Sequence, residues 1–514
     1  MSRIRTQQTL VWTGDQGSRC VCVALVTVSC AAAITMDGRP GAAQEEIAVA
    51  PVTRSRRVGI IAAAVVVALI AVGVVVFVST RGSSSASSST EPTVEVVDPP
   101  VTAPAPKIAP LAISDKVPTT AGIESQLSAQ LANPGLAQFS GVIIDPESGT
   151  VLWNKDSTAP QLPASTAKLL TGTALLTSVD PTSRFVTKVV KGDQEGDIVL
   201  VGGGDVTLSA RNEGVDTVYK GAPLMSDLAA QVRASGVDVK RIVLDTDYWS
   251  GPELADGWQT ADIRGTPASA QGYITRMSPL MVDGDREDPA NENSIRTGDP
   301  ANNAGKALAR LLGQPDVTIV DGSAPEEAEV IGQVSSQPMS VLLAQALENS
   351  DNVLAEALAR QVAIARGAPP SFDGASAATL EALEDLTIDT IGVELSDGSG
   401  LSTNDRVPPS VLGQVVALAV KGDPPAMRNL LTGMPVAGVS GSLTDRFQDD
   451  ASKAGAGWVR AKTGSLEVTY ALAGYVPDVD NRILVFAFVS NGVGSGTRPA
   501  LDALAAGLRG CGCA

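Results

Sequence analysis

A serine and a lysine are spaced for mutual contact in the stretch QLPASTAKLLTG, residues 161–172. Ser165 and Lys168 are three residues apart in a run with helical spacing, so a helix would place both side chains on one face. Pro163 predicts that the helix begins here, where free backbone N–H groups can stabilise a nucleophilic serine or an oxyanion. A Ser-x-x-Lys frame arises by chance about once in a chain of this length. The same residues therefore also fit the first turn of an ordinary amphipathic helix.

The absence of histidine limits the chemistry that this chain can perform. There are no histidines in its 514 residues, which excludes Ser-His-Asp and Cys-His triads and HExxH zinc sites. A hydrolase with this composition must take its base from lysine, a carboxylate or tyrosine. Lys168 would have to be neutral, whereas an ordinary lysine pKa of about 10.4 leaves under about 0.1% in that form at pH 7. Burial and a second cation nearby could lower the pKa of a lysine by about 3.

Lys462, in the sequence Lys462-Thr463-Gly464, is a candidate for that second cation. The surrounding sequence WVRAKTGSLEVTYALAGY is β-rich, and on a strand Lys462 and Gly464 would face one way and Thr463 the other. The glycine leaves space for a ligand backbone alongside the strand, and a lysine in the wall of a cleft binds carboxylates. Alone, this motif is better explained as a solvated lysine on an edge strand.

Ser350-Asp351-Asn352 interrupts a strongly helical pattern over residues 339–366. These residue types disfavour helix interiors, so three in a row predict a break between two helices. One interpretation is an N-cap for the second helix; the other is a catalytic serine with a nearby asparagine. Residues 402–404, Ser-Thr-Asn, have the same form, but the preceding DGSG explains them as a turn.

The order of predicted elements indicates an α+β fold rather than a doubly wound sheet. A helix is predicted at 123–132, a β-hairpin at 141–157 and another helix from Ser165 onward. Residues 184–334 mix short β-rich stretches with turns, and helical spacing returns at 302–313 and 339–366. Three strands, at 457–465, 468–477 and 482–491, precede a last helix at 501–508. The pattern is that of one mixed domain interrupted by an insertion.

The segment at 58–78 is an uncharged apolar run of 21 residues, long enough to span a membrane as a helix. Three arginines precede it, so we expect residues 1–57 in the cytoplasm and the rest of the chain outside. Residues 79–115 are predicted to be a Ser/Pro-rich linker. Two alternatives stay open: a cleaved signal, and a second span at 20–36 that would return the main domain to the cytoplasm. We expect that second run not to span and translation to begin at Met36, which would leave out residues 1–35.

The net charge and the positions of the cysteines argue against some classes of partner and of catalytic group. A net charge of −18 and 3% aromatic residues argue against nucleic acid. The five cysteines lie at 20, 22, 30, 511 and 513, so the body of the chain contains no thiol nucleophile. We expect the terminal CGC to be a mobile tail, and we predict neither a metal nor a cofactor.

Ser-x-x-Lys, Ser-x-Asn and Lys-Thr-Gly, in this order, form the motif set of the penicillin-recognising serine enzymes. The segments PASTAKLLT, ENSDNVLAEALAR, SDGSGLS, GVSGSLTDRF and AKTGSLEVTYALAGYV resemble the class C low-molecular-mass penicillin-binding proteins, the D-Ala-D-Ala carboxypeptidase/endopeptidase family. The resemblance covers residues 120–508, and the composition is similar to that of actinobacterial members.

This resemblance implies roles for the residues of the first two motifs. Ser165 would be the acylated nucleophile and Lys168 the base that accepts its proton. Ser350 would pass a proton to the leaving amine, and Asn352 would hydrogen-bond the substrate amide.

The third motif would bind the substrate. The resemblance implies that Lys462 binds the terminal carboxylate and lowers the pKa of Lys168, while Thr463 adds a hydroxyl contact. Gly464 would belong to the same substrate-binding strand. The backbone N–H groups of Ser165 and Ser465 would form the oxyanion hole.

The resemblance also implies a fold and a substrate. An antiparallel sheet flanked by helices would form a catalytic domain from residues 116–185 and 335–510, split by an inserted, β-rich domain at 186–334. The substrate would be a peptidoglycan stem peptide ending in D-Ala-D-Ala, cleaved outside the membrane through an acyl-enzyme that β-lactams trap. A β-lactamase and an inactive wall-binding scaffold protein are the competing hypotheses.

Overall fold

The computed structural model describes residues 115–512 of the protein. The expectations for the N-terminal segment, the apolar run at 58–78 and nearly all of the linker therefore lie outside the described residues. No helix within residues 115–512 is both long and apolar enough to cross a membrane.

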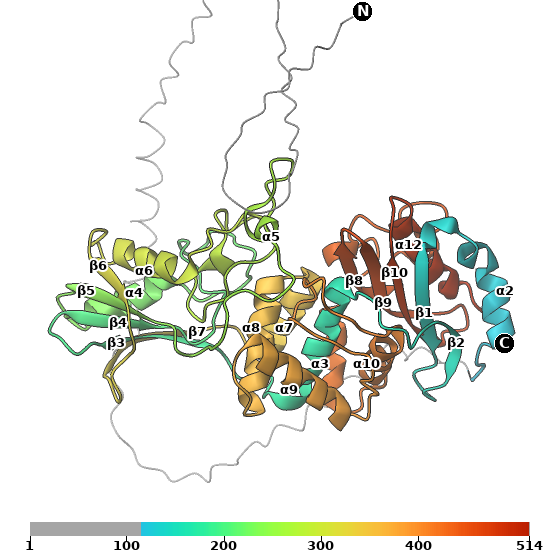
Figure 1. Ribbon diagram of the computed structural model, residues 1–514, viewed down its shortest axis with the longest axis horizontal. Coiled ribbons are helices and arrows are strands. Elements are labelled where there is room, and N and C mark those ends of the chain that lie inside the picture. The colour runs from blue at the N-terminus through green and yellow to red at the C-terminus, as the bar shows by residue number, and fades with distance from the viewer. Residues whose placement is uncertain (1–114, 513–514) are drawn as a thin grey trace, which may run out of the picture. The chain divides into compact units, whose positions relative to one another are not determined.

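The first sheet is built from segments near the two ends of the described chain (Figure 1). Its order is β2 (Val151–Lys155), β1 (Gln138–Ile144), β10 (Ile483–Asn491), β9 (Thr469–Pro477) and β8 (Arg460–Leu466), and every neighbouring pair is antiparallel. The predicted hairpin and the three predicted C-terminal strands are confirmed. β1, β9 and β10 are almost entirely buried, as expected for central strands whose two faces are both covered. β8 lies at the edge of the sheet, so one side of it is free to take a ligand backbone.

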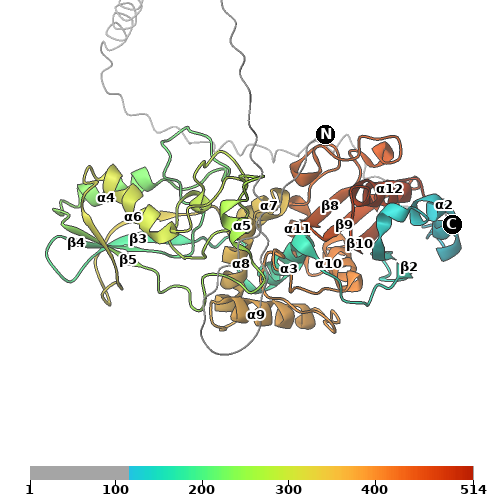
Figure 2. The ribbon, with the colours of Figure 1, turned by 45° about the horizontal axis from the view of Figure 1, so that its top comes forward.

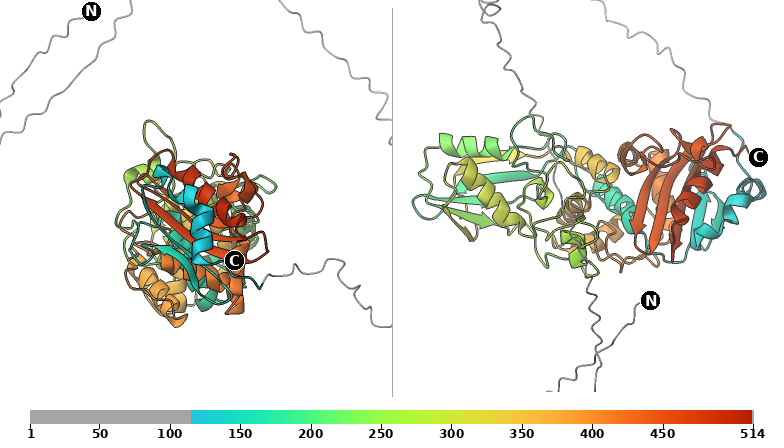
Figure 3. Two further views of the ribbon diagram at one scale, coloured as in Figure 1. Left: turned by 90° about the vertical axis from the view of Figure 1, so that its right-hand side faces the viewer. Right: turned by 90° about the horizontal axis from the view of Figure 1, so that it is seen from above.

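Helices cover both faces of this sheet (Figures 1 and 3). On one face α2 (Thr120–Leu131) and α12 (Thr497–Arg509) share an apolar core with the sheet. The other face packs on a larger core that contains residues of α3 (Lys168–Ser178), α7 (Met339–Glu348), α8 (Asn352–Ala365), α9 (Phe372–Asp385), α10 (Pro409–Lys421) and α11 (Arg428–Thr432). The antiparallel sheet flanked by helices is therefore present as expected.

The predicted helices are confirmed, and so is the break between two of them. α7 ends at Glu348 and α8 begins at Asn352, and the side chain of Asp351 caps α8 by accepting a hydrogen bond from the Leu354 N–H. Asp351, rather than Ser350, is thus the N-cap residue. Ser350 is left in the left-handed region with φ 58°, a conformation that non-glycine residues seldom adopt.

A second sheet lies between α3 and α7 in chain order. It has the order β6 (Thr318–Asp321), β5 (Arg241–Asp245), β4 (Asp197–Val201), β3 (Val186–Lys191) and β7 (Val330–Ser335). β4, β5 and β6 are parallel, whereas β3 is antiparallel to β4 and β7. Parallel neighbours need a crossover, and α4 (Met225–Ala234) and α6 (Pro300–Leu311) supply it (Figure 2). The segment is therefore rich in strands, as expected, but also carries helices packed on its sheet.

The long connection between β5 and α6 joins this segment to the first one. It contains α5 (Thr260–Arg264), and several of its apolar residues belong to the same core as α8 and α9. Its Arg286 donates a hydrogen bond to Asp351 at 2.6 Å, and both side chains are buried. Asn352 donates to the Tyr273 carbonyl at 3.1 Å. The connection thus contacts the residues at the break between α7 and α8.

The C-terminal residues differ from the mobile tail that the sequence predicted. Cys511 is fully buried in the core beside α12 and is disulfide-bonded, so this residue is not part of a mobile tail. The apolar face of α12 continues the core up to that point, which is why the chain stays packed beyond the helix.

Candidate active site

Ser165 lies in a 3-10 turn, Ala164–Ala167, which leads directly into α3. Ala164 has φ 47°, so the backbone immediately before the serine is strained. Two glycines allow other segments to approach this turn closely. A Cβ at position 464 would lie 2.6 Å from the Pro163 carbonyl oxygen, and one at position 400 would lie 2.0 Å from that of Ala164. β8 and the loop around Gly400 therefore hold the turn from two sides, which requires glycine at both points.

Lys168 is fully buried and its Nζ has three acceptors. Ser165 Oγ lies at 2.9 Å, Asn352 Oδ1 at 2.6 Å and the Ser399 carbonyl oxygen at 2.8 Å. A neutral amine has two N–H bonds and one lone pair. It can donate to Asn352 and Ser399 and accept the hydroxyl proton of Ser165. The geometry therefore suits a base that removes the serine proton.

The electrostatics of Lys168 favour this neutral form. Burial lowers the pKa of Lys168 to about 8, although the attraction of Asp397, Asp351 and Glu356 opposes the shift. Roughly one-tenth of such a lysine is neutral at pH 7, against under about 0.1% of an ordinary one. Burial alone thus supplies most of the shift that the sequence argument required.

The Ser350-Asp351-Asn352 motif contacts the Lys462-Thr463-Gly464 motif. Lys462 is fully buried, and its Nζ donates to Ser350 Oγ at 2.8 Å and to the Thr463 carbonyl at 3.0 Å. Burial, and then the charges of Lys168 and Arg446, lower the pKa of Lys462 well below its usual range. The charge of Lys168 thus disfavours the charged form of Lys462, and burial is the largest cause of both pKa shifts.

Asn352 contacts other protein groups in this structure, and its expected hydrogen bond to the substrate amide stays a prediction. Both ends of its amide are engaged within the protein, the oxygen by Lys168 and the nitrogen by the Tyr273 carbonyl. Its neighbour Asp351 is buried, which opposes ionisation, but Arg286 and the Leu354 N–H outweigh burial and hold the pKa of Asp351 below its usual value. Asn352 therefore orients the lysine in this structure.

The remaining positions of the third motif lie along β8. Lys462 faces Ser350 at the break between α7 and α8, and Gly464 faces the turn that carries Ser165. Thr463 Oγ1 shares a hydrogen bond of 2.7 Å with Ser442 Oγ, and Ser465 is exposed. The predicted site residues are thus brought together by α3, the α7–α8 break and β8.

Three buried carboxyl groups near Lys168 could not be assigned from the sequence. Asp397 accepts hydrogen bonds from the backbone N–H groups of Ser399 and Gly400 and from the Trp258 indole. Glu356 accepts one from the Gly398 N–H, and burial, followed by Asp397, raises the pKa of Glu356 to about 7. Asp405 binds the Ser396 N–H, and burial, followed by Asp397, raises its pKa well above its usual value.

These groups shape the loop that presents the Ser399 carbonyl to Lys168. The segment SDGSGLS was noticed only as a turn and as part of the resemblance, because residue types do not reveal that a backbone carbonyl contacts a lysine. The alternative Ser-Thr-Asn at 402–404 lies in the second half of this loop, where Ser402 Oγ donates to the Asp256 carbonyl. No group of three or more acidic or cysteine side chains in residues 115–512 is arranged to hold a metal ion.

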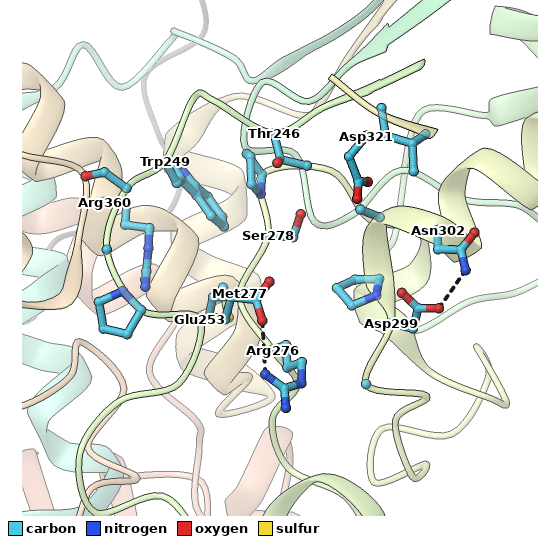
Figure 4. A pocket seen from close by; sticks show the side chains of 18 of the residues that line it. Thr246, Trp249, Glu253, Arg276, Met277, Ser278, Asp299, Asn302, Asp321 and Arg360 are labelled. Carbon is cyan, nitrogen blue, oxygen red and sulfur yellow. Dashed lines mark hydrogen bonds and ion pairs between the residues drawn. The ribbon is translucent and has the colours of Figure 1, made fainter. Parts of the chain in front are cut away.

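A cavity of about 660 Å³ lies apart from these motifs (Figure 4). It is lined by the carboxyl ends of β5 and β6, the beginning of α6 and the connection between them. In Figure 4, Trp249 and Arg360 lie on one side and Asp299 and Asn302 on the other. It contains none of Ser165, Lys168, Ser350 or Lys462, so its size does not make it the catalytic site.

Comparisons with known proteins agree with the motif set. The family model described as the D-Ala-D-Ala carboxypeptidase 3 (S13) family matches residues 123–293 and 286–508. Carboxypeptidase DacB of Mycolicibacterium smegmatis is 45% identical over 469 residues, which is 90% of this chain and 99% of that protein. A carboxypeptidase of Mycobacterium tuberculosis is 42% identical over 409 residues, 79% of this chain and 87% of the relative.

The fold has a counterpart among solved structures. The crystal structure of penicillin binding protein 4 from Haemophilus influenzae superposes with a TM-score of 0.59 at 20% sequence identity. The match covers 76% of this chain and 98% of the other. The two proteins thus share their overall fold.

Proposed function

The chain belongs to the D-Ala-D-Ala carboxypeptidase S13 family and is a serine D-Ala-D-Ala carboxypeptidase, and from this premise we propose that Ser165 is its nucleophile and Lys168 its base. The observation that carries the proposal is the 2.9 Å contact between Lys168 Nζ and Ser165 Oγ. The other two acceptors of Lys168 use both N–H bonds of a neutral amine, which leaves its lone pair for the serine proton.

In the proposed acylation, Ser165 Oγ attacks the carbonyl carbon of the D-Ala-D-Ala bond while its proton moves to Lys168. The C–N bond then breaks, the leaving D-Ala amine takes up a proton, and an ester to Ser165 forms. Water hydrolyses this ester and regenerates the serine. In acylation the proton of Ser165 moves to Lys168 and ends on the leaving amine, so that Lys168 is neutral again. In hydrolysis the attacking water gives a proton to Lys168, which returns it to Ser165 Oγ as the ester breaks, so water is the one further reactant.

We propose Ser350 as the group that passes the proton to the leaving amine. Its hydroxyl accepts a hydrogen bond from Lys462 at 2.8 Å, so its own proton is free to point toward the substrate. Lys462 then serves to orient Ser350. We assign Asn352 to holding Lys168, because both ends of its amide are engaged in the protein.

The oxyanion hole is proposed to be the backbone N–H groups of Ser165 and Ser465. The close approach of Gly464 to Pro163 supports this pairing, since it brings β8 against the turn that carries the nucleophile. Thr463 and Ser465 then offer hydroxyl groups to the part of the substrate that lies along β8.

The biological setting follows from the same premise. We propose that the substrate is a peptidoglycan stem peptide ending in D-Ala-D-Ala and that β-lactams acylate Ser165. The Haemophilus influenzae relative has been solved in complex with a β-lactam, which supports the second statement. From the sequence we further propose a membrane anchor at 58–78 after a cytoplasmic segment, and an extracytoplasmic catalytic domain of residues 116–185 and 335–510 with an insertion at 186–334.

The experiment that tests the assignment compares the wild type with Ser165→Ala. A fluorescent penicillin should label the wild type covalently, and the wild type should release D-Ala from a D-Ala-D-Ala peptide. Ser165→Ala should do neither while keeping the same thermal unfolding curve. Labelling of the variant would overturn the choice of nucleophile. Breakdown of the penicilloyl-enzyme many times per second would favour the β-lactamase hypothesis.

A further inference from the structure

Asp397 lies at the start of the loop that faces the catalytic lysine, and its side chain accepts four hydrogen bonds. Its Oδ1 accepts the backbone N–H groups of Ser399 at 3.0 Å and of Gly400 at 2.6 Å. Its Oδ2 accepts the backbone N–H of Ser402 at 2.7 Å and the indole N–H of Trp258 at 2.7 Å. The side chain is buried, and four N–H donors suit an ionised carboxylate. One carboxylate therefore fixes the backbone of this part of the loop.

The backbone that Asp397 fixes contacts both the base and the turn that carries the nucleophile. The Ser399 carbonyl accepts a hydrogen bond from Lys168 Nζ at 2.8 Å. Gly400 packs against the nucleophile turn, where a Cβ would lie 2.0 Å from the Ala164 carbonyl oxygen. A shift of this loop would therefore displace the amine of the base and the hydroxyl of the nucleophile relative to each other.

Trp258 binds Asp397 from a different part of the chain, the connection between β5 and α6. Its ring packs edge-on against Phe372 of α9, with ring centres 5.1 Å apart and an angle of 87° between the ring planes. This packing fixes the direction of the indole N–H. A hydrogen bond to a charged acceptor is stronger than one between neutral groups. The indole thus anchors a carboxylate whose other three N–H donors belong to its own loop.

The charge of Asp397 also acts on Lys168. Burial lowers the pKa of Lys168 to about 8, and Asp397 is the largest of the charges that oppose this shift. Charged groups face Lys168 from three sides: Asp397 and Asp405 from the loop, Asp351 and Glu356 from the start of α8, and Lys462 from β8. Glu356 is paired with Arg360 on the same helix. Loss of the Asp397 charge should therefore lower the pKa of Lys168 further, although Glu356, whose pKa Asp397 helps to raise to about 7, would then ionise more readily and offset part of the change.

We propose that Asp397 positions Lys168 and Ser165 relative to each other, and that the indole of Trp258 keeps Asp397 in the orientation that this requires. The inference rests on the proposed function, because it takes Lys168 as the base and Ser165 as the nucleophile. Asp397 acts through the backbone of its loop and Trp258 acts through Asp397, so both are positioning residues. Through Trp258, the geometry of the site depends on the segment between α3 and α7.

The first test measures acylation by penicillin from about pH 5.5 to about pH 9.5 in the wild type and in Asp397→Asn. The variant turns an amide NH2 toward backbone N–H groups, so the loop should shift. We expect the limiting rate at high pH to fall at least about 100-fold, because misplacement by about 1 Å is enough for such a loss. The midpoint of the pH profile should move down by about half to one pH unit, a change that a purely structural role would not produce.

The second test uses Trp258→Phe, which keeps an aromatic ring and the charge of Asp397 but removes the N–H. The limiting rate should fall about 10-fold, as expected for one hydrogen bond to a charged acceptor, and the midpoint should stay where it is. Trp458→Phe, at an exposed tryptophan stacked on Arg509, is the matched control. Asp389→Asn is the control for the carboxylate, because Asp389 is exposed and also accepts a backbone N–H. Both controls should acylate like the wild type.

The results that would overturn the inference differ from those that bear on the proposed function. A slower Asp397→Asn with an unshifted midpoint would show a structural role alone and overturn the inference, and so would a Trp258→Phe that acylates like the wild type. If Asp397→Asn fails to fold, Trp258→Phe decides alone. Labelling that persists in Ser165→Ala would instead contradict the proposed function, whereas loss of labelling there with wild-type rates in Asp397→Asn would overturn only this inference.

Discussion

At the residue scale, the two buried lysines contact different serines. Lys168 contacts the nucleophile, whereas Lys462 contacts Ser350, and the two are held by different acceptors. Burial lowers the pKa of both, so neither depends on the other for its main shift. The expectation that Lys462 binds the terminal carboxylate and lowers the pKa of Lys168 by its charge stays a prediction. A substrate carboxylate bound near β8 would favour the charged form of Lys462 and so strengthen that effect during the reaction.

The pKa of Lys168 predicts the pH dependence of acylation. Only the neutral amine can accept the serine proton, and burial lowers the pKa of this lysine to about 8. Since the active form is the deprotonated one, the acylation rate by penicillin should rise about tenfold per pH unit below pH 8 and level off above it. Stopped-flow labelling between pH 5.5 and 9.5 measures this profile. A rate that is flat across this range, or that falls as pH rises toward 8, would contradict a lysine base.

At the scale of the elements, the site depends on how closely β8 and the 396–405 loop approach the turn before α3. Gly400 is required for two reasons, because its φ is +77° and because there is no room for a Cβ. Gly464 is required only because there is no room for a Cβ. The turn also contains Ala164 in a strained conformation, which persists only because its surroundings hold it. The nucleophile is therefore positioned by three segments that are far apart in the sequence.

Gly464→Ala should separate positioning from folding. The added methyl would meet the Pro163 carbonyl at 2.6 Å and push β8 away from Ser165. We expect penicillin acylation to slow at least about 100-fold, because misplacement by about 1 Å is enough for such a loss. The thermal unfolding midpoint should fall by only a few degrees. The matched control is Gly494→Ala, where a Cβ meets no atom within 4 Å and which should acylate like the wild type. Equal acylation rates for both variants would contradict the positioning argument.

At the scale of the whole molecule, the segment between α3 and α7 takes part in building the site. Arg286 pairs with Asp351, the Tyr273 carbonyl holds Asn352, and Trp258 binds Asp397. Each of these contacts holds a residue that acts on Lys168. Asn352 accepts a hydrogen bond from Lys168, and the charges of Asp351 and Asp397 raise its pKa. We infer that this segment supports the catalytic machinery as well as adding surface to it.

Substitution of Arg286 should show how strongly the residues at the α7–α8 break depend on the segment between α3 and α7. Arg286→Met leaves the buried Asp351 without its counter-charge, so we expect a loss of about 3–5 kcal/mol in the free energy of unfolding. Arg286→Met combined with Asp351→Asn, which keeps an N-cap, should recover much of that loss. Urea unfolding of the four proteins measures the coupling. Because the pKa of Asp351 is lowered in the folded state, its contribution is present above the unfolded pKa and is lost as pH falls toward and below it. Additive effects of the two substitutions would contradict the pairing.

Much of the local structure could be predicted, because it depends on neighbouring residues. The hairpin of β1 and β2, the three C-terminal strands and the break between α7 and α8 follow from period and from residue types that disfavour helices. The sheet order β2-β1-β10-β9-β8 could not be predicted from these patterns, since it joins segments more than 300 residues apart. The parallel arrangement of β4, β5 and β6 was missed because the periodicity of a strand does not tell which strands pair or in which direction.

The sequence by itself determined the chemistry that is available: without histidine, a hydrolase must take its base from lysine, a carboxylate or tyrosine, and three ordered motifs supply Ser165, Lys168, Ser350 and Lys462. Only the tertiary structure decided which lysine contacts which serine, that Asn352 and the Ser399 carbonyl hold Lys168, and that Trp258 binds Asp397. The physical reason is that a pKa and a contact depend on burial by distant segments. Residue types state which groups can react, whereas packing determines which of them are dry, charged and close enough to do so.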